Sequence, residues 1–206
     1  MIKLFCERAR HASCVIDVGV NHGLYLYHAV ACCGAEAEIV GVEANPSLAQ
    51  SVNANLLRNG FGPLVTVAAL TASEGPVRLH VGADDMVSSL RPDHVDRYGG
   101  AVATLEIPGV SLDSLLARRE LHPDLIKIDV EGHETAVLAG ATETLAVHRP
   151  TLFVEVTPDT FNEVDTVLRS ASYRGAVFTA AGLCAPDPDL INSRGYCNLL
   201  YEHTSG

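Results

Sequence analysis

Apolar runs of strand length alternate along the chain with segments whose apolar residues recur at helical spacing. The apolar run at 15–16 ends in a turn of polar and glycine residues, and the segment 24–34 then keeps its apolar residues on one helical face. A second apolar run, 39–42, is followed by Asn45 in the position of a helix N-cap and by Pro46 in the first helical position. The first part of the chain therefore predicts two units of strand, turn and helix.

The pattern changes in the middle of the chain. The run 64–70 predicts a third strand, and in 77–81 apolar residues alternate with an arginine and a histidine, as in a half-exposed strand. The segment 82–100 has no sustained period and many turn-forming residues, so it predicts a long loop. We expect an inserted hairpin and loop at about 75–110.

The alternation of strand and helix returns in the second half of the chain. The further predicted segments are a strand and short helix within 103–121, a strand, acidic turn and helix within 124–148, a strand at 151–156, a helix within 158–173 and two closing strands at 175–180 and 197–203. Strands that alternate with helices favour a mostly parallel sheet with helices on both faces, an α/β sandwich of three layers. We expect residues 1–206 to form one such domain.

Acidic and small polar residues follow several of these strands. In open α/β sheets ligands bind outside the carboxyl ends of the strands, where the strand order reverses. Those ends are predicted at Asp17 to Gly23, Glu43 to Asn45, Ala69 to Leu70, Asp129 to His133 and Glu155 to Thr157. The polar groups that could carry a function should therefore lie along one edge of the sheet.

Composition narrows the classes of partner. The chain has 206 residues, of which 48% are hydrophobic and 19% charged, which is typical of one folded domain. Its formal charge of -11 repels nucleic-acid phosphates and anionic lipid, so we expect no nucleic-acid or membrane partner and favour neutral or cationic ligands. Six cysteines without a CxxC pair, and no apolar run of membrane-spanning length, predict a reduced, soluble, cytoplasmic protein of unknown oligomeric state.

The stretch "VIDVGVNHG", residues 15–23, predicts the class of ligand. Its two glycines lack a Cβ, so a ligand and the following helix can approach the backbone closely. An aspartate stands two residues before the first glycine, where it disfavours a pyrophosphate and suits a cation. Glu43, at the end of the second strand, is placed to bind two ribose hydroxyls. Together these features predict S-adenosyl-L-methionine as the cofactor, bound by Asp17, Gly19, Asn21, Gly23, Glu43, Ala44, Asn45, Ala69 and Asp129.

The chain also resembles a known family. The stretches "VIDVGVNHG", "VGVEANP", "SLDSLL", "LIKIDVEGHETAVLAGA" and "LFVEV" are similar, in order, to the motifs of the FkbM family of S-adenosylmethionine-dependent methyltransferases over roughly 14–156. The resemblance implies a Rossmann-like class I methyltransferase fold, with a seven-stranded sheet whose last strand is antiparallel. It also implies O-methylation of a small-molecule hydroxyl, often on a sugar or a secondary metabolite. Two features depart from the family pattern. Val20 and His22 stand in the turn where the family commonly has alanine and isoleucine, and only about a dozen residues precede the first motif. The second departure bears on how the substrate is covered.

Methylation of a hydroxyl requires a group that takes its proton. The catalytic candidates are Asp129, Glu131, His133 and Glu155. If the strand continues past Asp129, that residue and Glu131 share one face, so we expect the first near the cofactor amino acid or the acceptor and the second at the acceptor. His133 is a second candidate base. Glu155 interrupts an apolar strand and so needs the cleft or a partner, whereas Glu134 is interpreted as a helix-dipole residue.

Other readings remain open at this level. "HETAV" begins like a zinc-protease motif but has valine in place of the second histidine, so we predict no metal site. A divalent ion bound by Asp129, Glu131 and Glu155 is a minor alternative. Ser88 and Ser89 could contact a substrate, although solvated serines are the commoner case. One rival function is a domain that binds the adenosyl cofactor without turnover. The other is a nicotinamide-dependent oxidoreductase, which the absence of a GxGxxG motif disfavours.

Overall fold

The computed structural model describes residues 1–83, 88–180 and 182–204. Its strands within these ranges are β1 (Cys14–Val18), β2 (Glu38–Glu43), β3 (Val65–Val67), β4 (Ala69–Leu70), β5 (Gly75–Gly82), β6 (Ser88–Ser89), β7 (Ala101–Val110), β8 (Leu125–Ile128), β9 (Thr151–Val156), β10 (Tyr173–Thr179), β11 (Gly182–Cys184) and β12 (Cys197–His203). The α-helices are α1 (Ile2–Ala9), α2 (Leu24–Cys32), α3 (Pro46–Arg58), α4 (Pro92–Asp96), α5 (Leu112–Arg119), α6 (Glu134–Ala139), α7 (Phe161–Ser170) and α8 (Pro188–Arg194). A short π-helical turn covers Thr144–His148.

Among the described residues, eight strands form the main sheet in the order β11-β10-β12-β9-β8-β1-β2-β3. The five strands from β3 to β9 are parallel to their neighbours, whereas β12 is antiparallel to both β9 and β10. This confirms the expected class I arrangement, in which the last strand is inserted antiparallel. The structure adds a short edge strand, β11, that pairs with β10.

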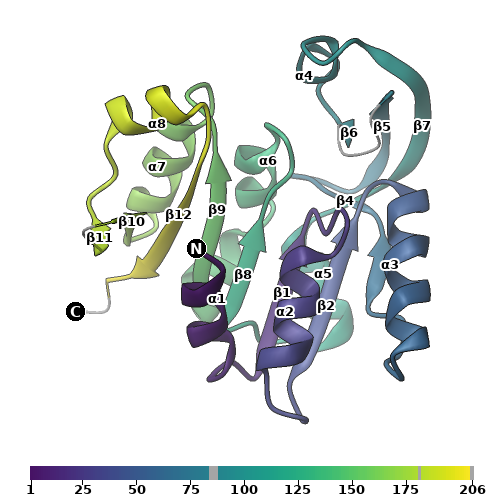
Figure 1. The fold of residues 1–206 in the computed structure, drawn as a ribbon, viewed down its shortest axis with the longest axis horizontal. Coiled ribbons are helices and arrows are strands. Elements are labelled where there is room, and N and C mark those ends of the chain that lie inside the picture. The colour runs from purple at the N-terminus through teal and green to yellow at the C-terminus, as the bar shows by residue number, and fades with distance from the viewer. Residues whose placement is uncertain (84–87, 181, 205–206) are drawn as a thin grey trace.

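Helices cover both faces of this sheet (Figure 1). Strand residues alternate between the two faces, so Val15 of β1 packs with Phe5 of α1 and Ala29 of α2. The next residue of β1, Ile16, belongs to the core that α5, α6 and α7 share, for example through Leu168. These two buried layers make the sandwich that the alternation of strands and helices predicts.

The boundaries of the best-defined helix are explained by its ends. Asn45 caps α3, because its side-chain Oδ1 accepts a hydrogen bond of 3.0 Å from the Ser47 amide. Pro46 occupies the first helical position, where the missing amide proton costs nothing. Both assignments confirm the sequence-based prediction. No helix in the described ranges is long and apolar enough to cross a membrane.

The third predicted strand is divided, which corrects the single strand expected at 64–70. β3 pairs with β2 only as far as Val67, because β2 ends at Glu43, and the Ala68 amide makes the last bond to the Glu43 carbonyl at 3.1 Å. The chain then turns away and pairs as β4 with the end of β7, Ala69 opposite Gly109. A change of partner at the end of a neighbouring strand is invisible to a hydrophobicity pattern.

β4 belongs to a second sheet, in the order β4-β7-β5-β6. β5 and β7 pair antiparallel from Gly75 opposite Gly109 to Val81 opposite Ala103, and the register shifts after Val81. The segment 82–100, expected as a loop, contains β6 and α4; its residues 84–87 lie outside the described ranges. Figure 1 shows this second sheet standing over the carboxyl ends of the parallel strands.

Candidate active site

A groove lies at the carboxyl edge of the main sheet, between that edge and the second sheet. Its lining residues are Val18, Gly19, Asn21, Val42, Glu43, Ala44, Leu48, Ala68, Ala69, Leu70, Leu79, Ser88, Ser89, Leu90, Asp129, Val130, Glu131 and His133. The apolar members come from β1, β2, α3 and the second sheet, and the acids stand at the ends of β2 and β8. Most of the residues singled out from the sequence therefore meet in one place, whereas Asp17, Gly23, Asn45 and Glu155 do not line the groove.

The glycines of the first turn make room for the protein itself. Gly19 has φ +79°, and a Cβ built there would lie 1.7 Å from the Asp129 carbonyl oxygen. Gly23 has φ +89°, and its Cβ would lie 2.8 Å from the ring of Tyr27. Close approach of a ligand and of the following helix was the reason predicted for these glycines. The helix part holds at Gly23, where α2 fills the space, whereas at Gly19 the turn after β8 occupies the position of a Cβ.

Glu43 is buried and held in a fixed orientation. Its Oε2 accepts a hydrogen bond of 2.7 Å from the Asn21 amide, and its Oε1 accepts one of 2.7 Å from the Asn45 amide. Asn21 adopts φ 50°, a conformation that asparagine tolerates better than most side chains. Burial raises the pKa of Glu43, and the backbone hydrogen bonds oppose that shift. The carboxylate is thus oriented in advance at the wall of the groove.

Asp17 lies beneath the groove, within β1, and is only 2% exposed. Its register partner is Lys127 of β8, which is wholly buried. Lys127 Nζ lies 3.2 Å from Asp129 Oδ2, donates to the Ile128 carbonyl at 3.2 Å and stands 5.0 Å from the centre of the Tyr25 ring. Burial raises the pKa of Asp17 to about 7, and Lys127 counteracts the shift.

Lys127 is a buried residue of the candidate site that was not expected from the sequence. The signal was present, because a lysine inside the apolar strand "LIKI" has no place in a core unless a carboxylate accompanies it. Its ammonium group pairs with Asp129, which lines the groove, and its charge lowers the pKa of the buried Asp17 on the neighbouring strand. The sequence alone does not show that β1 and β8 are neighbours, and that adjacency creates the cluster.

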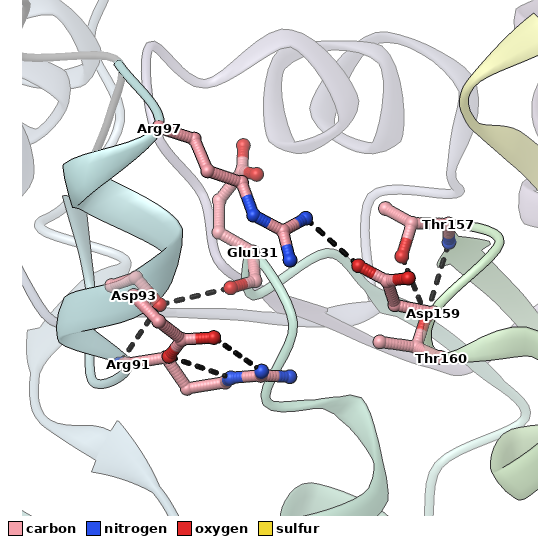
Figure 2. Close-up of polar contacts among 8 residues, drawn as sticks. Arg91, Asp93, Arg97, Glu131, Thr157, Asp159 and Thr160 are labelled. Atoms are coloured by element: carbon pink, nitrogen blue, oxygen red, sulfur yellow. Dashed lines mark hydrogen bonds and ion pairs between the residues drawn. The ribbon is translucent and has the colours of Figure 1, made fainter. Parts of the chain in front are cut away.

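The turn after β8 does not continue the strand. β8 ends at Ile128, and Glu131 has φ 51°, so the condition under which alternation would place Asp129 and Glu131 on one face is not met. The turn brings both residues to the groove by a different route. The Glu131 carbonyl accepts a hydrogen bond of 2.9 Å from Ser89 Oγ, which in turn accepts one of 3.1 Å from the Arg91 amide. Figure 2 shows this link between the turn and the segment before α4.

The Glu131 carboxylate faces a histidine that the sequence did not suggest. Its Oε2 lies 2.9 Å from Nε2 of His94, in α4. Burial raises the pKa of Glu131 to about 7, and the neighbouring carboxylates of Asp129 and Glu155 add to the shift. Burial also lowers the pKa of His94, so the neutral imidazole is favoured near neutral pH.

His133 precedes α6 as its N-cap residue and lines the groove. Its Nε2 is buried and has no hydrogen-bond partner in the described part of the chain. Burial first, and then the charge of Arg91, lower the pKa of His133. Glu134 stands in the first turn of α6 as expected, where its Oε1 also accepts a 3.0 Å hydrogen bond from the Gly132 amide.

The largely buried carboxylate of Glu155 is hydrogen-bonded to an asparagine. Its Oε2 accepts a hydrogen bond of 2.7 Å from Asn198 Nδ2 on the neighbouring strand β12. Burial and the charge of Asp129 raise its pKa. In residues 1–83, 88–180 and 182–204 no group of three or more His, Cys, Asp or Glu side chains is placed to hold a metal ion.

Comparison with known proteins adds a family to this geometry. A sequence model of the Methyltransferase FkbM domain matches residues 17–174. The curated hexuronic acid methyltransferase AglP of Haloferax volcanii is 28% identical over 151 residues, which are 70% of this chain and 56% of that protein. The chain thus spans little more than half the length of that relative.

Solved structures show the same fold. A methyltransferase FkbM from Methylobacillus flagellatus KT superposes with a TM-score of 0.59 at 18% identity, over 93% of this chain and 43% of the other. An O-methyltransferase from Bacillus cereus, solved in complex with SAH, gives 0.51 at 14% identity over 97% and 76%. TomG from Streptomyces achromogenes, solved with SAM, gives 0.51 at 13% identity over 100% and 79%. At such identities the likeness concerns the fold.

Proposed function

Since the chain belongs to the FkbM methyltransferase domain family, we propose that it transfers a methyl group from S-adenosylmethionine to a hydroxyl group of a small molecule such as a sugar or a secondary metabolite. The observation that carries the proposal is the groove at the carboxyl edge, with the fixed acid Glu43 at one wall and Asp129 and Glu131 at another. The relative that methylates a hexuronic acid supports a sugar as the acceptor.

The groove fits the three parts of the cofactor. Apolar side chains, among them Leu48 and Leu79, offer an adenine site, and the oriented carboxylate of Glu43 suits ribose hydroxyls. Asp129 is the proposed partner of the cofactor ammonium group. Asp129 pairs with the buried ammonium group of Lys127, whose charge also acts on Asp17 and Glu155. Three acids thus share one buried cation, so this part of the protein favours a further cation. When bound, the cofactor supplies an electrophilic methyl group.

Glu131 is the proposed acceptor of the hydroxyl proton. Its carboxyl pKa of about 7 lies close to physiological pH, where a general base combines a useful ionised fraction with sufficient basicity. His94 contacts the carboxylate and orients it. His133, with its unpaired buried Nε2, is the second candidate base. Asp129 and Glu155 are proposed to set the charge of the site, because both raise the pKa of Glu131.

Calorimetry with S-adenosylmethionine and with S-adenosylhomocysteine tests the first half of the proposal. Saturable binding of both is expected, and the absence of both would contradict a methyltransferase. The second half is tested with labelled S-adenosylmethionine and a panel of sugars and hydroxylated metabolites. Cofactor binding without transfer to any member of that panel would favour the alternative of a binding domain without turnover.

A further inference from the structure

A second pocket adjoins the groove on the far side of the turn 131–133. It lies between α4 and the loop that follows β9, and its walls include Arg91, His94, Arg97, Tyr98, Thr157 and Asp159. The two spaces share this turn, because Glu131 and His133 line the groove and Gly132 lines the pocket. The pocket therefore stands beside the carboxyl ends of β8 and β9, next to the groove proposed for the methyl donor.

One arginine extends across this pocket, and a second is paired on its own wall. Arg97 Nη1 reaches Asp159 Oδ2 at 2.8 Å, and Arg91 holds Asp93 with two hydrogen bonds, of 3.2 Å from Nε and 2.6 Å from Nη2. Figure 2 shows the Arg97 guanidinium joined to Asp159 on the loop that carries Thr157, and the Arg91 guanidinium joined to Asp93 on the α4 side. The pair of Arg97 and Asp159 thus bridges the pocket between elements far apart in the sequence.

These arginines have hydrogen-bonding capacity to spare. A guanidinium has five N–H donors, of which these contacts use two in Arg91 and one in Arg97. The side chains are 41% and 58% exposed, and ion pairs at such exposure contribute little to stability. An incoming carboxylate can therefore share either guanidinium or replace its present partner at small cost.

The charges that line the pocket balance one another. Two arginines, Arg91 and Arg97, and two aspartates, Asp93 and Asp159, line it, whereas the whole chain has 25 acidic residues against 14 lysines and arginines. After burial, the charges of the two arginines lower the pKa of His94, and Asp93 opposes them. The pocket thus lacks the excess of negative charge that the whole molecule carries, so the net charge of the chain does not exclude an anionic ligand here. Tyr98 adds an aromatic ring whose side chain is largely exposed, at 61%.

We propose that this pocket binds the methyl acceptor and that the acceptor is an acidic sugar whose carboxylate is held by Arg97 and Arg91. The inference rests on the proposed function, because it names the substrate class of that reaction. Arginine suits a carboxylate through paired N–H donors, and an exposed aromatic ring suits the apolar face of a pyranose. A sugar bound here lies next to His94. The Nε2 atom of His94 in turn lies 2.9 Å from the carboxylate of Glu131, which is proposed to take the hydroxyl proton.

Ligand-observed NMR with four probes tests this inference: glucuronate, galacturonate, glucose and galactose, each with and without S-adenosylhomocysteine. Saturable binding of at least one uronate is expected, at least about tenfold tighter than its neutral counterpart, because a charge-assisted hydrogen bond is lost. Arg97→Gln should weaken uronate binding by a similar factor and leave S-adenosylhomocysteine binding unchanged. The matched control is Arg118→Gln, since Arg118 forms a 2.6 Å pair with Glu74 at similar exposure away from the pocket.

Each contrary result has a distinct meaning. Equal binding of neutral and acidic sugars, no binding of any uronate, or an Arg97→Gln protein that binds uronate normally would overturn the inference. Loss of S-adenosylhomocysteine binding in Arg97→Gln would assign the guanidinium to the cofactor and overturn it as well. If the unmodified protein binds no S-adenosylhomocysteine, the proposed function fails; if it does bind and the uronates do not, only the acidic acceptor fails.

Discussion

Glu131 Oε2 and His94 Nε2 lie 2.9 Å apart, although 37 positions separate the two residues in the sequence. Glu131 belongs to the turn after β8 of the main sheet, and His94 belongs to α4, which connects two strands of the second sheet. Burial raises the pKa of Glu131 and lowers the pKa of His94, so it favours the neutral form of both groups. The pair therefore joins the turn after β8 to the inserted segment at the point where the acceptor is proposed to bind. Its protonation should be visible in the reaction.

Methyl transfer should depend on the protonation of Glu131. Because the pKa of its carboxyl is about 7, we expect kcat/KM to rise with pH through that value as the carboxylate forms, and then to level off. Glu131→Gln should lower kcat by about 10²–10⁴-fold while leaving S-adenosylhomocysteine binding intact. A pH profile without this rise, or a fully active Glu131→Gln protein, would transfer the role to His133. His94→Gln is the companion variant, and it should alter the apparent pKa of the profile.

Glu43 should determine the affinity for the adenosyl group. Glu43→Gln keeps the shape of the side chain but removes its charge and places an amide where two backbone amides donate. We expect S-adenosylhomocysteine to bind at least about tenfold more weakly, since charge-assisted hydrogen bonds are lost. Glu36→Gln, at an exposed acid between α2 and β2, is the control. Unchanged affinity in the first variant would remove Glu43 from the proposed ribose site.

Lys127 should be required for stability. Lys127→Met removes the only ammonium group near Asp17 and Asp129 within the described ranges, and breaking a buried pair in this way typically costs about 3–5 kcal/mol. Urea denaturation monitored by circular dichroism measures the loss. The double variant Asp17→Asn/Lys127→Met should recover part of it, because the unpaired buried carboxyl is neutralised. Strict additivity of the two single effects would show that the residues do not interact.

Asp17 should make stability depend on pH. Its pKa is about 7 in the folded protein and near 4 in the unfolded chain, so the folded state binds more protons between these values. The free energy of unfolding contributed by this group is therefore highest at low pH and falls as pH rises towards about 7. The Asp17→Asn protein should show a flatter dependence of unfolding on pH across that interval. An identical slope in both proteins would contradict the raised pKa.

Gly19 should tolerate no side chain. Gly19→Ala places a Cβ 1.7 Å from the Asp129 carbonyl oxygen at φ +79°, so the turn after β8 must move. We expect a loss of about 3 kcal/mol or more in the free energy of unfolding, or a protein that does not fold. Gly34→Ala is the matched control, because a Cβ there meets no atom within 4 Å. Equal stability of the two variants would show that the turns are not packed together.

Sequence patterning was sufficient for most elements of the main sheet but not for the order in which they pair. The alternation of strands and helices and the cap of α3 follow from local signals, since each is read within a few residues, for example the "NP" pair at Asn45. The acids at the strand ends converged because parallel strands share one carboxyl edge. This reasoning brought Glu43, Asp129 and Glu131 to one groove.

The contacts that were missed depend on residues distant in the sequence. His94 reaches Glu131 because a segment without periodicity contains α4. Lys127 lies opposite Asp17 in the sheet because β8 pairs with β1. The positive φ of Glu131 likewise overrides strand alternation through the packing of the turn. Such features arise from tertiary contacts, and a local pattern carries no information about them.

The division of the third strand has a consequence for how this fold can vary. Ala69 and Leu70 pair with Gly109 and Val110, so the inserted segment enters and leaves the main body at adjacent positions. A segment anchored in this way can be lengthened, shortened or exchanged without changing the register of the parallel strands. The same segment carries Leu79, Ser89 and α4, which cover the groove and the neighbouring pocket. Changes in this one segment can therefore reshape the walls of both the groove and the pocket while the parallel strands stay as they are.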